Sequence, residues 1–105
     1  MAWLYLLIAS GGEIVWAYTL KASEGYTRPV MIALNIAALL FAAWFLMQAM
    51  RTLPLGTAYA VWTGIGTVGA AILGILIMGE SASPARLAAI GMIVAGVALL
   101  KLVEG

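Results

Sequence analysis

Long apolar runs dominate the chain, and short polar segments separate them. An apolar run of about 17–25 residues forms a helix that crosses the hydrocarbon core of a membrane, which is about 30 Å thick. A helix on the surface of a soluble domain carries a polar face, whereas these runs carry none. The pattern predicts an all-α membrane protein of one domain with four transmembrane helices, at about residues 2–20, 30–50, 55–78 and 87–100.

Prolines and charged residues mark the limits of the runs. Pro29, Pro54 and Pro84 stand where a helix would begin, the position at which a missing amide donor costs least. The fourth run is the shortest, and it spans the core if the Lys101 side chain extends to the membrane surface. We expect tight loops at residues 21–28, 51–54 and 79–86.

Composition excludes several other classes of protein. Hydrophobic residues make up 66% of the chain and charged residues 9%, against about 45–50% and about 25% in a soluble domain. A soluble fold of 105 residues could not bury so much apolar surface. The chain holds no Cys and no His, so we expect no disulfide, no metal site and no cofactor. The net charge of +1 and the lack of a basic run argue against nucleic acid as a partner.

The first run also has a feature of a secretory signal peptide, because Ala9, Ser10 and Gly11 form a small-residue stretch like a cleavage site. Signal peptides begin with basic residues, and no Lys or Arg precedes this run. The run also continues past Gly11, and further runs follow it. We therefore interpret the first run as a membrane span.

Glu13 lies deep inside the first run, which holds no other charged residue. A carboxylate at this depth is costly unless it is paired, hydrated or protonated. Burial favours the neutral acid over the anion, so Glu13 is predicted to bind protons and, when ionised, cations. The alternative, a side chain that extends to the membrane surface, is disfavoured because Glu is short.

Polar and aromatic residues stand at helical spacing from Glu13. Ser10, Glu13 and Trp16 share one face at i, i+3 and i+6, and the third run repeats the pattern with Tyr59 and Trp62. Aromatic rings near a buried carboxylate line a cation site through their faces and orient the acid through their polar tips. We therefore predict a substrate pocket formed by these side chains.

Aromatic residues also gather in belts at membrane surfaces. We assign Trp3 and Trp44 to such a belt, and Tyr59 fits either the belt or the pocket. The other carboxylates, Glu24 and Glu80 in loops and Glu104 near the end, are expected to be solvated.

The third run contains a literal G-x-G-x-x-G motif at Gly64, Gly66 and Gly69. No strand precedes it, and no acidic residue follows at the distance that a dinucleotide ribose requires. We interpret these glycines as helix-packing positions, and Gly64 and Gly66 as a hinge at which the helix bends. An enzyme is not expected, because no pair of ionisable groups within the runs could serve as acid and base in one chain.

Basic residues are balanced between the two sides of the membrane. Lys21, Arg28 and Arg86 fall on one side, and Arg51, Lys101 and the terminal amine fall on the other. Orientation follows the asymmetry of Lys and Arg in short loops, so we expect the chain to insert in both directions. The alternative is that insertion partners or lipids set one orientation.

Four helices supply one layer of packing, so a charged site in the middle needs a second chain to shield it. We therefore expect a homo-oligomer. Small residues let helices approach closely, and the fourth run carries a strip of them that we predict as the dimer contact: Ala88, Gly91, Ala95 and Gly96.

These residues match the pattern of a known family. The chain resembles the small multidrug resistance family of proton-coupled exporters over essentially its whole length. The resemblance implies an antiparallel dual-topology homodimer in the inner membrane of a bacterium, with both copies of Glu13 in one site for protons or a cationic substrate. The matching pieces are Glu13, Lys21 with Ser23-Glu24-Gly25-Tyr26-Thr27-Arg28, and Pro54-x-Gly56-x-Ala58-Tyr59-Ala60-x-Trp62-x-Gly64-x-Gly66.

Within the family, the pattern Glu13-x-x-Trp16-Ala17-x-x-Leu20-Lys21 resembles the guanidinium-exporter subtype. This resemblance implies a proton-coupled antiporter for guanidinium or small substituted guanidinium ions. The broad quaternary-ammonium exporters usually carry Gly in place of Trp16. Two residues depart from the subtype, which usually has Gly in place of Ser10 and a pocket Ser in place of Ala42.

Several alternatives remain open at this point. Ser10 could supply the hydroxyl contact to Glu13 that Ala42 lacks, or the pocket could have changed its substrate. The chain could pair with a sister subunit, or export quaternary ammonium and aromatic cations broadly. A subunit that only stabilises a partner bundle, with Glu13 as an interhelical hydrogen bonder, is a further alternative.

Overall fold

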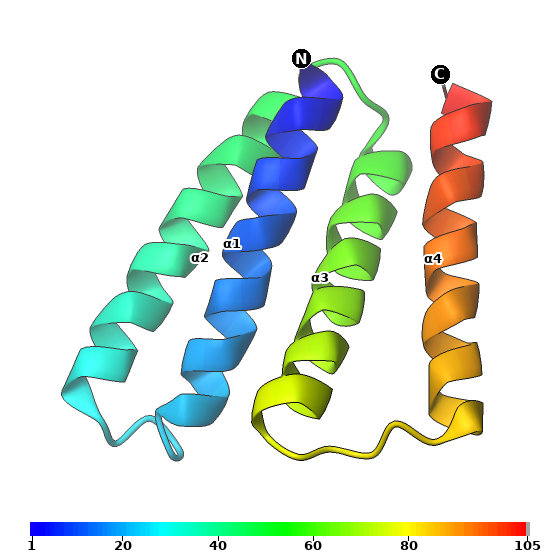
Figure 1. Ribbon diagram of the computed structural model, residues 1–105. Helices are drawn as coiled ribbons and strands as arrows, with labels where there is room; N and C mark the ends of the chain where they lie inside the picture. Colours follow the sequence, from blue (N-terminus) through cyan, green and yellow to red (C-terminus); the bar gives the residue numbers. More distant parts are fainter. Residues whose placement is uncertain (105) are drawn as a thin grey trace.

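The computed structural model describes residues 1–104, which form four helices joined by short loops (Figure 1). All four helices are apolar and long enough to cross a membrane, which confirms the prediction of four apolar helices. Their bounds are α1 Ala2–Ala22, α2 Pro29–Ala49, α3 Leu55–Ile77 and α4 Pro84–Glu104.

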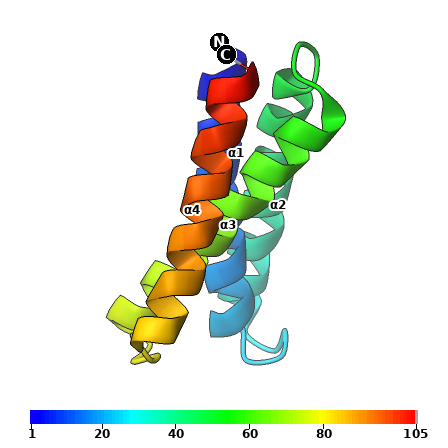
Figure 2. The same ribbon diagram turned by 90° about the vertical axis from the view of Figure 1, so that its right-hand side faces the viewer.

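The helices lie side by side in one layer, in the order α2, α1, α3, α4 (Figure 1). The principal extents of the molecule are 41 × 35 × 16 Å, so its thickness is less than half of its width or height. In the view turned by 90°, α4 is nearest the viewer, as the last helix of the layer (Figure 2). Each broad face of this layer is therefore open.

Helix α4 is longer than the predicted run at 87–100, because it begins at Pro84 and continues to Glu104. Proline is favoured in the first turn of a helix, and the Ser83 hydroxyl accepts a hydrogen bond from the Arg86 amide at 3.3 Å. These two features start the helix three residues early. Lys101 lies in the last turn of this helix, and the extension of its side chain to the membrane surface stays a prediction.

Small residues hold α1 close to α2. A Cβ atom built on Gly12 would lie 2.9 Å from the Ala42 Cβ, which is too close for two carbons. Buried side chains from three helices form the core, and the described residues of α4 contribute none: Leu6 and Ala9 of α1, Leu46 and Ala49 of α2, and Ala58 and Val61 of α3.

Helix α4 packs on α3 through a single stripe, and none of its described residues is fully buried. A Cβ built on Gly64 of α3 would lie 2.7 Å from Cγ2 of Val97, so the helices approach closely there. The stripe follows helical spacing and comprises Arg86, Ile90, Ile93, Val97 and Leu100, which are partly buried.

The C-terminal end of α4 also has two polar contacts with the other helices. Thr57 of α3 donates a hydrogen bond to Glu104 Oε1 at 3.1 Å. The Lys101 ammonium lies 4.9 Å from the centre of the Trp3 ring, within reach of a cation–π contact. Glu104 is therefore hydrogen-bonded rather than only solvated as expected.

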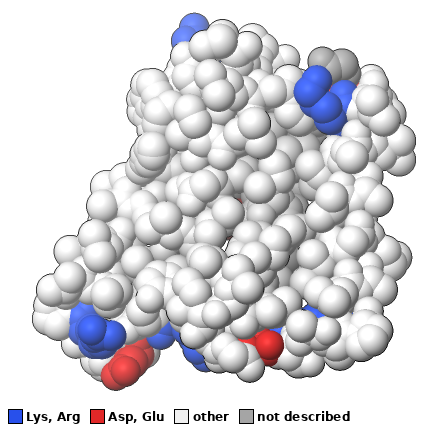
Figure 3. Space-filling view, viewed as in Figure 1, with Lys and Arg blue, Asp and Glu red and all other residues white. Residues whose placement is uncertain are grey.

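Charged side chains gather at the two ends of the molecule and leave a broad uncharged band between them (Figure 3). One end carries Lys21, Arg28 and Arg86, and the other carries Arg51 and Lys101. Glu80, which we expected to be solvated, forms an ion pair of 2.5 Å with Arg86.

Candidate functional site

The Glu13 carboxylate lies in the seam between α1 and α3. A Cβ atom built on Gly66 would overlap Oε2 of Glu13, so the glycine forms a notch that receives the carboxylate. Within residues 1–104, Oε2 of Glu13 is the buried side-chain polar atom that lacks a hydrogen-bond partner. A buried acceptor without a partner is costly, and a carboxylate oxygen of this kind is able to take up a proton or to pair with a cation.

A cavity of about 210 Å³ opens beside this carboxylate. Three helices line it: α1 with Glu13 and Trp16, α2 with Leu39 and Ala42, and α3 with Tyr59 and Trp62. The structure thus brings together Glu13 and the three aromatic residues that helical spacing had selected. A carboxylate surrounded by aromatic rings suits a small organic cation.

The two aromatic residues of α3 are held in different ways. The Trp62 indole donates a hydrogen bond from Nε1 to the Ala9 carbonyl of α1 at 3.2 Å. Its ring lies 5.5 Å from that of Tyr59 with an interplanar angle of 58°. Tyr59 is half exposed. Trp62 is therefore anchored to α1, whereas Tyr59 reaches out from the open face of the layer.

Ser10 is not among the residues that line this cavity. Its side chain is fully buried, and its hydroxyl donates a hydrogen bond to the Leu6 carbonyl at 2.8 Å. A helical serine commonly bonds to the carbonyl four residues earlier, and the lack of water in an apolar setting favours that bond. This bond uses the hydroxyl proton that a contact to Glu13 would have needed.

Leu39 and Ala42 line the cavity from α2, and helical spacing had selected neither of them. Ala42 entered only through the family resemblance, as the residue that replaces a serine. Helix α2 is apolar except for Asn35 and Gln48. Asn35 stands one and two turns before Leu39 and Ala42 on the same face of the helix, so it is the signal in the sequence that could have found them.

Helix α3 is continuous through Gly64 and Gly66, the two predicted hinge residues. In this conformation both glycines serve as contact points, Gly66 for Glu13 and Gly64 for Val97 of α4. Their role as a hinge stays a prediction.

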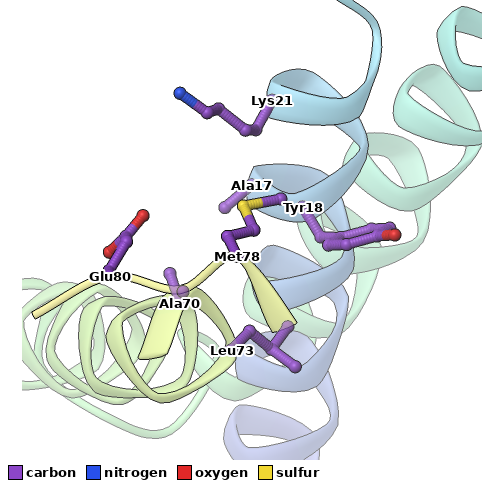
Figure 4. Close-up of a pocket in the computed structure, with 8 residues that line it drawn as sticks. Ala17, Tyr18, Lys21, Ala70, Leu73, Met78 and Glu80 are labelled. Carbon is purple, nitrogen blue, oxygen red and sulfur yellow. The ribbon is translucent and has the colours of Figure 1, made fainter. Parts of the chain in front are cut away.

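A second cavity, of about 160 Å³, lies beside the loop that joins α3 to α4 (Figure 4). It is lined by residues of α1 and α3, including Lys21, and by Glu80. Arg86 already pairs with Glu80 and neutralises its charge. Lys21 then leaves a net positive charge at this cavity. An organic cation is better accommodated beside Glu13, where no basic side chain lines the wall.

The small residues of α4 face away from the site. Successive residues of a helix turn by about 100°, which places Ala88, Gly91 and Ala95 opposite the stripe that contacts α3. Gly96 lies on the flank of the helix. A Cβ built on Gly91 or Gly96 meets no atom within 4 Å, so this face is open in the single chain.

A model of the Small Multidrug Resistance protein family matches residues 1–93 of the chain. The protein belongs to this family. Guanidinium exporters of Citrobacter freundii and Salmonella typhimurium are each 60% identical to it over 97% of both chains. The guanidinium exporter of Yersinia pseudotuberculosis is 51% identical over 97% of this chain and 98% of its own.

Membership in the small multidrug resistance family confirms the resemblance inferred from the sequence. Together with the four apolar helices, it identifies a multi-pass transport protein of the bacterial inner membrane. The relatives are exporters, which agrees with the expectation of a transporter rather than an enzyme.

Proposed function

We propose that the protein exports guanidinium or small substituted guanidinium ions in exchange for protons, and that both bind at Glu13. The observation that carries this proposal is the buried Oε2 atom of Glu13, which has no hydrogen-bond partner in residues 1–104 and lies beside a cavity lined by aromatic rings. The cavity offers one negative charge and no positive one, so a cation and a proton compete for the same oxygen atoms.

Guanidinium fits this site better than a spherical cation does. It is planar and carries several N–H donors, so it bonds a carboxylate in bidentate fashion, which a quaternary ammonium ion cannot do. The faces of Trp16, Tyr59 and Trp62 provide flat surfaces on which such an ion stacks. The names of the relatives point to the same substrate.

The working unit in this proposal is an antiparallel homodimer of chains inserted in opposite orientations. One layer of helices, 16 Å thick, leaves the Glu13 cavity open on a broad face, and a second layer would close it. The outward strip of Ala88, Gly91 and Ala95 on α4 supports close contact with a partner helix. The balance of basic residues between the two ends supports insertion in both orientations.

Exchange follows if the two Glu13 carboxylates share one cavity. Coupled carboxylates titrate as a pair, and guanidinium, like the arginine side chain, stays charged at physiological pH. Binding of the substrate therefore displaces protons, and binding of protons displaces the substrate. If the empty or doubly occupied dimer does not alternate between the two membrane faces, inward proton flow then drives outward cation flow.

Replacement of Glu13 by Gln tests this proposal. We expect purified Glu13→Gln protein in proteoliposomes to lose guanidinium uptake driven by a pH gradient, because the amide cannot hold the cation or exchange the proton. Glu24→Gln, which changes a carboxylate in an exposed loop, serves as the matched control and should transport like the unmodified chain. Proton-coupled uptake that survives in Glu13→Gln would contradict the proposal.

One observation favours a second candidate function, the export of bulkier quaternary ammonium and aromatic cations. Ala42 places a methyl group, not a hydroxyl, in the α2 wall beside Leu39, which leaves that wall apolar. Comparison of guanidinium, a singly substituted guanidine and tetraethylammonium in the same proteoliposomes separates the two functions. Equal transport of all three would favour the second. A lack of flux with this chain alone would point to a sister subunit or to a purely structural role.

A further inference from the structure

Asn35 is a buried polar residue on an otherwise apolar stretch of α2. Its exposed fraction is 3%, and it lies six residues after the helix begins at Pro29. An amide in an apolar, membrane-crossing helix is costly unless its donors and its acceptor find partners within the protein. Such residues are retained for a function that an apolar residue cannot perform.

The side-chain amide of Asn35 bonds α1 through its nitrogen. Nδ2 donates to the Trp16 carbonyl at 2.8 Å and to the Thr19 hydroxyl at 3.2 Å. A carbonyl oxygen only accepts, so the atom that faces Trp16 must be the NH₂ group. The orientation of the amide is thereby set by its partners.

The oxygen of the same amide bonds the loop between α1 and α2. Tyr26 donates from its phenol to Oδ1 of Asn35 at 3.0 Å. The loop reaches this position through a turn in which Glu24, Gly25 and Tyr26 all have positive φ, at 52°, 74° and 67°. The Tyr26 bond uses a separate atom of the amide and does not contact α1.

One of these bonds involves a residue that lines the Glu13 cavity. Trp16, whose carbonyl accepts from Asn35, lines the cavity with its side chain. Leu39 and Ala42, which line the cavity from α2, follow Asn35 at i+4 and i+7 and so share its face of the helix. The Asn35 bond thus joins two adjoining walls of the cavity.

A second fixed point between the same helices lies one turn earlier along α1. The close approach of Gly12 to Ala42 prevents α1 and α2 from moving nearer to each other. The two helices are still free to rotate and slide against each other, because their surfaces there are small and apolar. A directional hydrogen bond restricts both motions. The contact and the bond together hold the α1 backbone at Trp16 in place against α2.

We propose that Asn35 is a positioning residue of the Glu13 site, which acts through the Trp16 carbonyl to set the size of the cation that the cavity accepts. This inference rests on the proposed function. Asn35 itself does not touch the substrate, since it is not among the residues that line the cavity. Its loss changes the relative KM values for small and large cations, not the binding chemistry of Glu13.

The test compares Asn35→Leu, which removes both sets of bonds, with Tyr26→Phe, which removes only the bond to Oδ1. Each protein is reconstituted, and KM is measured for guanidinium and for tetraethylammonium under the same pH gradient. We expect Asn35→Leu to change the ratio of the two KM values by about threefold or more, the scale of one interhelical hydrogen bond in a membrane. We expect Tyr26→Phe to leave the ratio unchanged.

A purely structural role for Asn35 predicts a different result, in which the amount of assembled protein falls while the KM ratio stays constant. An unchanged ratio in Asn35→Leu would therefore overturn the inference. Asn35→Ala, which also removes both sets of bonds, provides a second variant if the leucine protein does not insert; it should shift the ratio in the same direction, and no shift would also overturn the inference. Failure of the proposed function is distinct, because the unmodified chain would then show no guanidinium flux.

Discussion

The seam between α1 and α3 differs sharply from the outer face of α4, although both are rich in glycine. In the seam, Gly66 receives the carboxylate of Glu13. On α4, Gly91 has no atom near the position of a Cβ, and no described residue of the helix is fully buried. Glycine therefore makes room for the Glu13 carboxylate in the seam, whereas on α4 it leaves the surface open.

The contrast separates two tasks within a chain of 105 residues. Helices α1, α2 and α3 build the cavity and the buried core, whereas α4 adds one packing stripe and presents small residues outward. Substitutions in the first region should alter transport in a folded protein. Substitutions on the outer face of α4 should alter assembly first.

The largest effect is expected for Gly66→Ala. The added methyl would overlap the Glu13 carboxylate, which is the far end of a flexible side chain, so the protein folds while the carboxylate moves aside. Displacement of a functional group by about 1 Å can cost about a hundredfold in rate, and we expect a loss on this scale in guanidinium flux from proteoliposomes. Gly56→Ala, at an open position of the same helix, is the control and should retain full flux. Equal losses in both variants would show that the loss does not arise from the contact between residue 66 and Glu13.

A smaller effect, on assembly, is expected for Gly91→Leu. The isobutyl group would fill the open strip on α4 and keep a partner helix at a distance. We expect the dimer to dissociate about tenfold more readily, which corresponds to about 1.4 kcal/mol, as measured by dilution and cross-linking in detergent. Val94→Leu, an exposed position on the flank of the same helix, should leave the dimer unchanged. Undiminished dimerisation of Gly91→Leu would place the interface elsewhere.

The smallest effect, on selectivity, is expected for Trp16→Gly. Removal of the indole takes away one aromatic surface of the cavity and enlarges it, so guanidinium should lose its preference over tetraethylammonium by about two- to fivefold, the scale of one cation–π contact. The ratio of KM values in proteoliposomes measures this preference. Trp44→Gly makes the same change at a half-exposed position outside the cavity and should not alter the ratio. An unchanged ratio of KM values in Trp16→Gly would show that the indole does not determine selectivity.

Much of this architecture could be predicted from the sequence because membrane helices have a simple requirement. A span must be long and apolar, so the runs themselves indicate the helices, and a carboxylate inside such a run is conspicuous. Helical spacing then selects Trp16 beside Glu13, and it selects Tyr59 and Trp62 as a pair on one face of α3.

Other features could not be predicted, because they depend on which helix faces which. Leu39 lines the cavity through the placement of α2, and Asn35, the polar residue on that face, does not show which helix the face contacts. Ser10 stands at the right spacing from Glu13, yet its hydroxyl bonds within its own helix. The two bonds from Asn35 to α1 join residues 16 and 19 positions apart in the sequence, and only the pairing of α1 with α2 brings them together.

The thinness of the helix layer has a genetic consequence for the proposed dimer. In the proposed dimer each chain supplies one layer and only half of the closed site, so the two halves come from separate copies of the chain. In a cell that carries an intact and a damaged allele, random pairing traps intact chains in defective complexes. Mutations that spare folding but disable Glu13 therefore behave as dominant alleles, whereas mutations that prevent insertion behave as recessive ones.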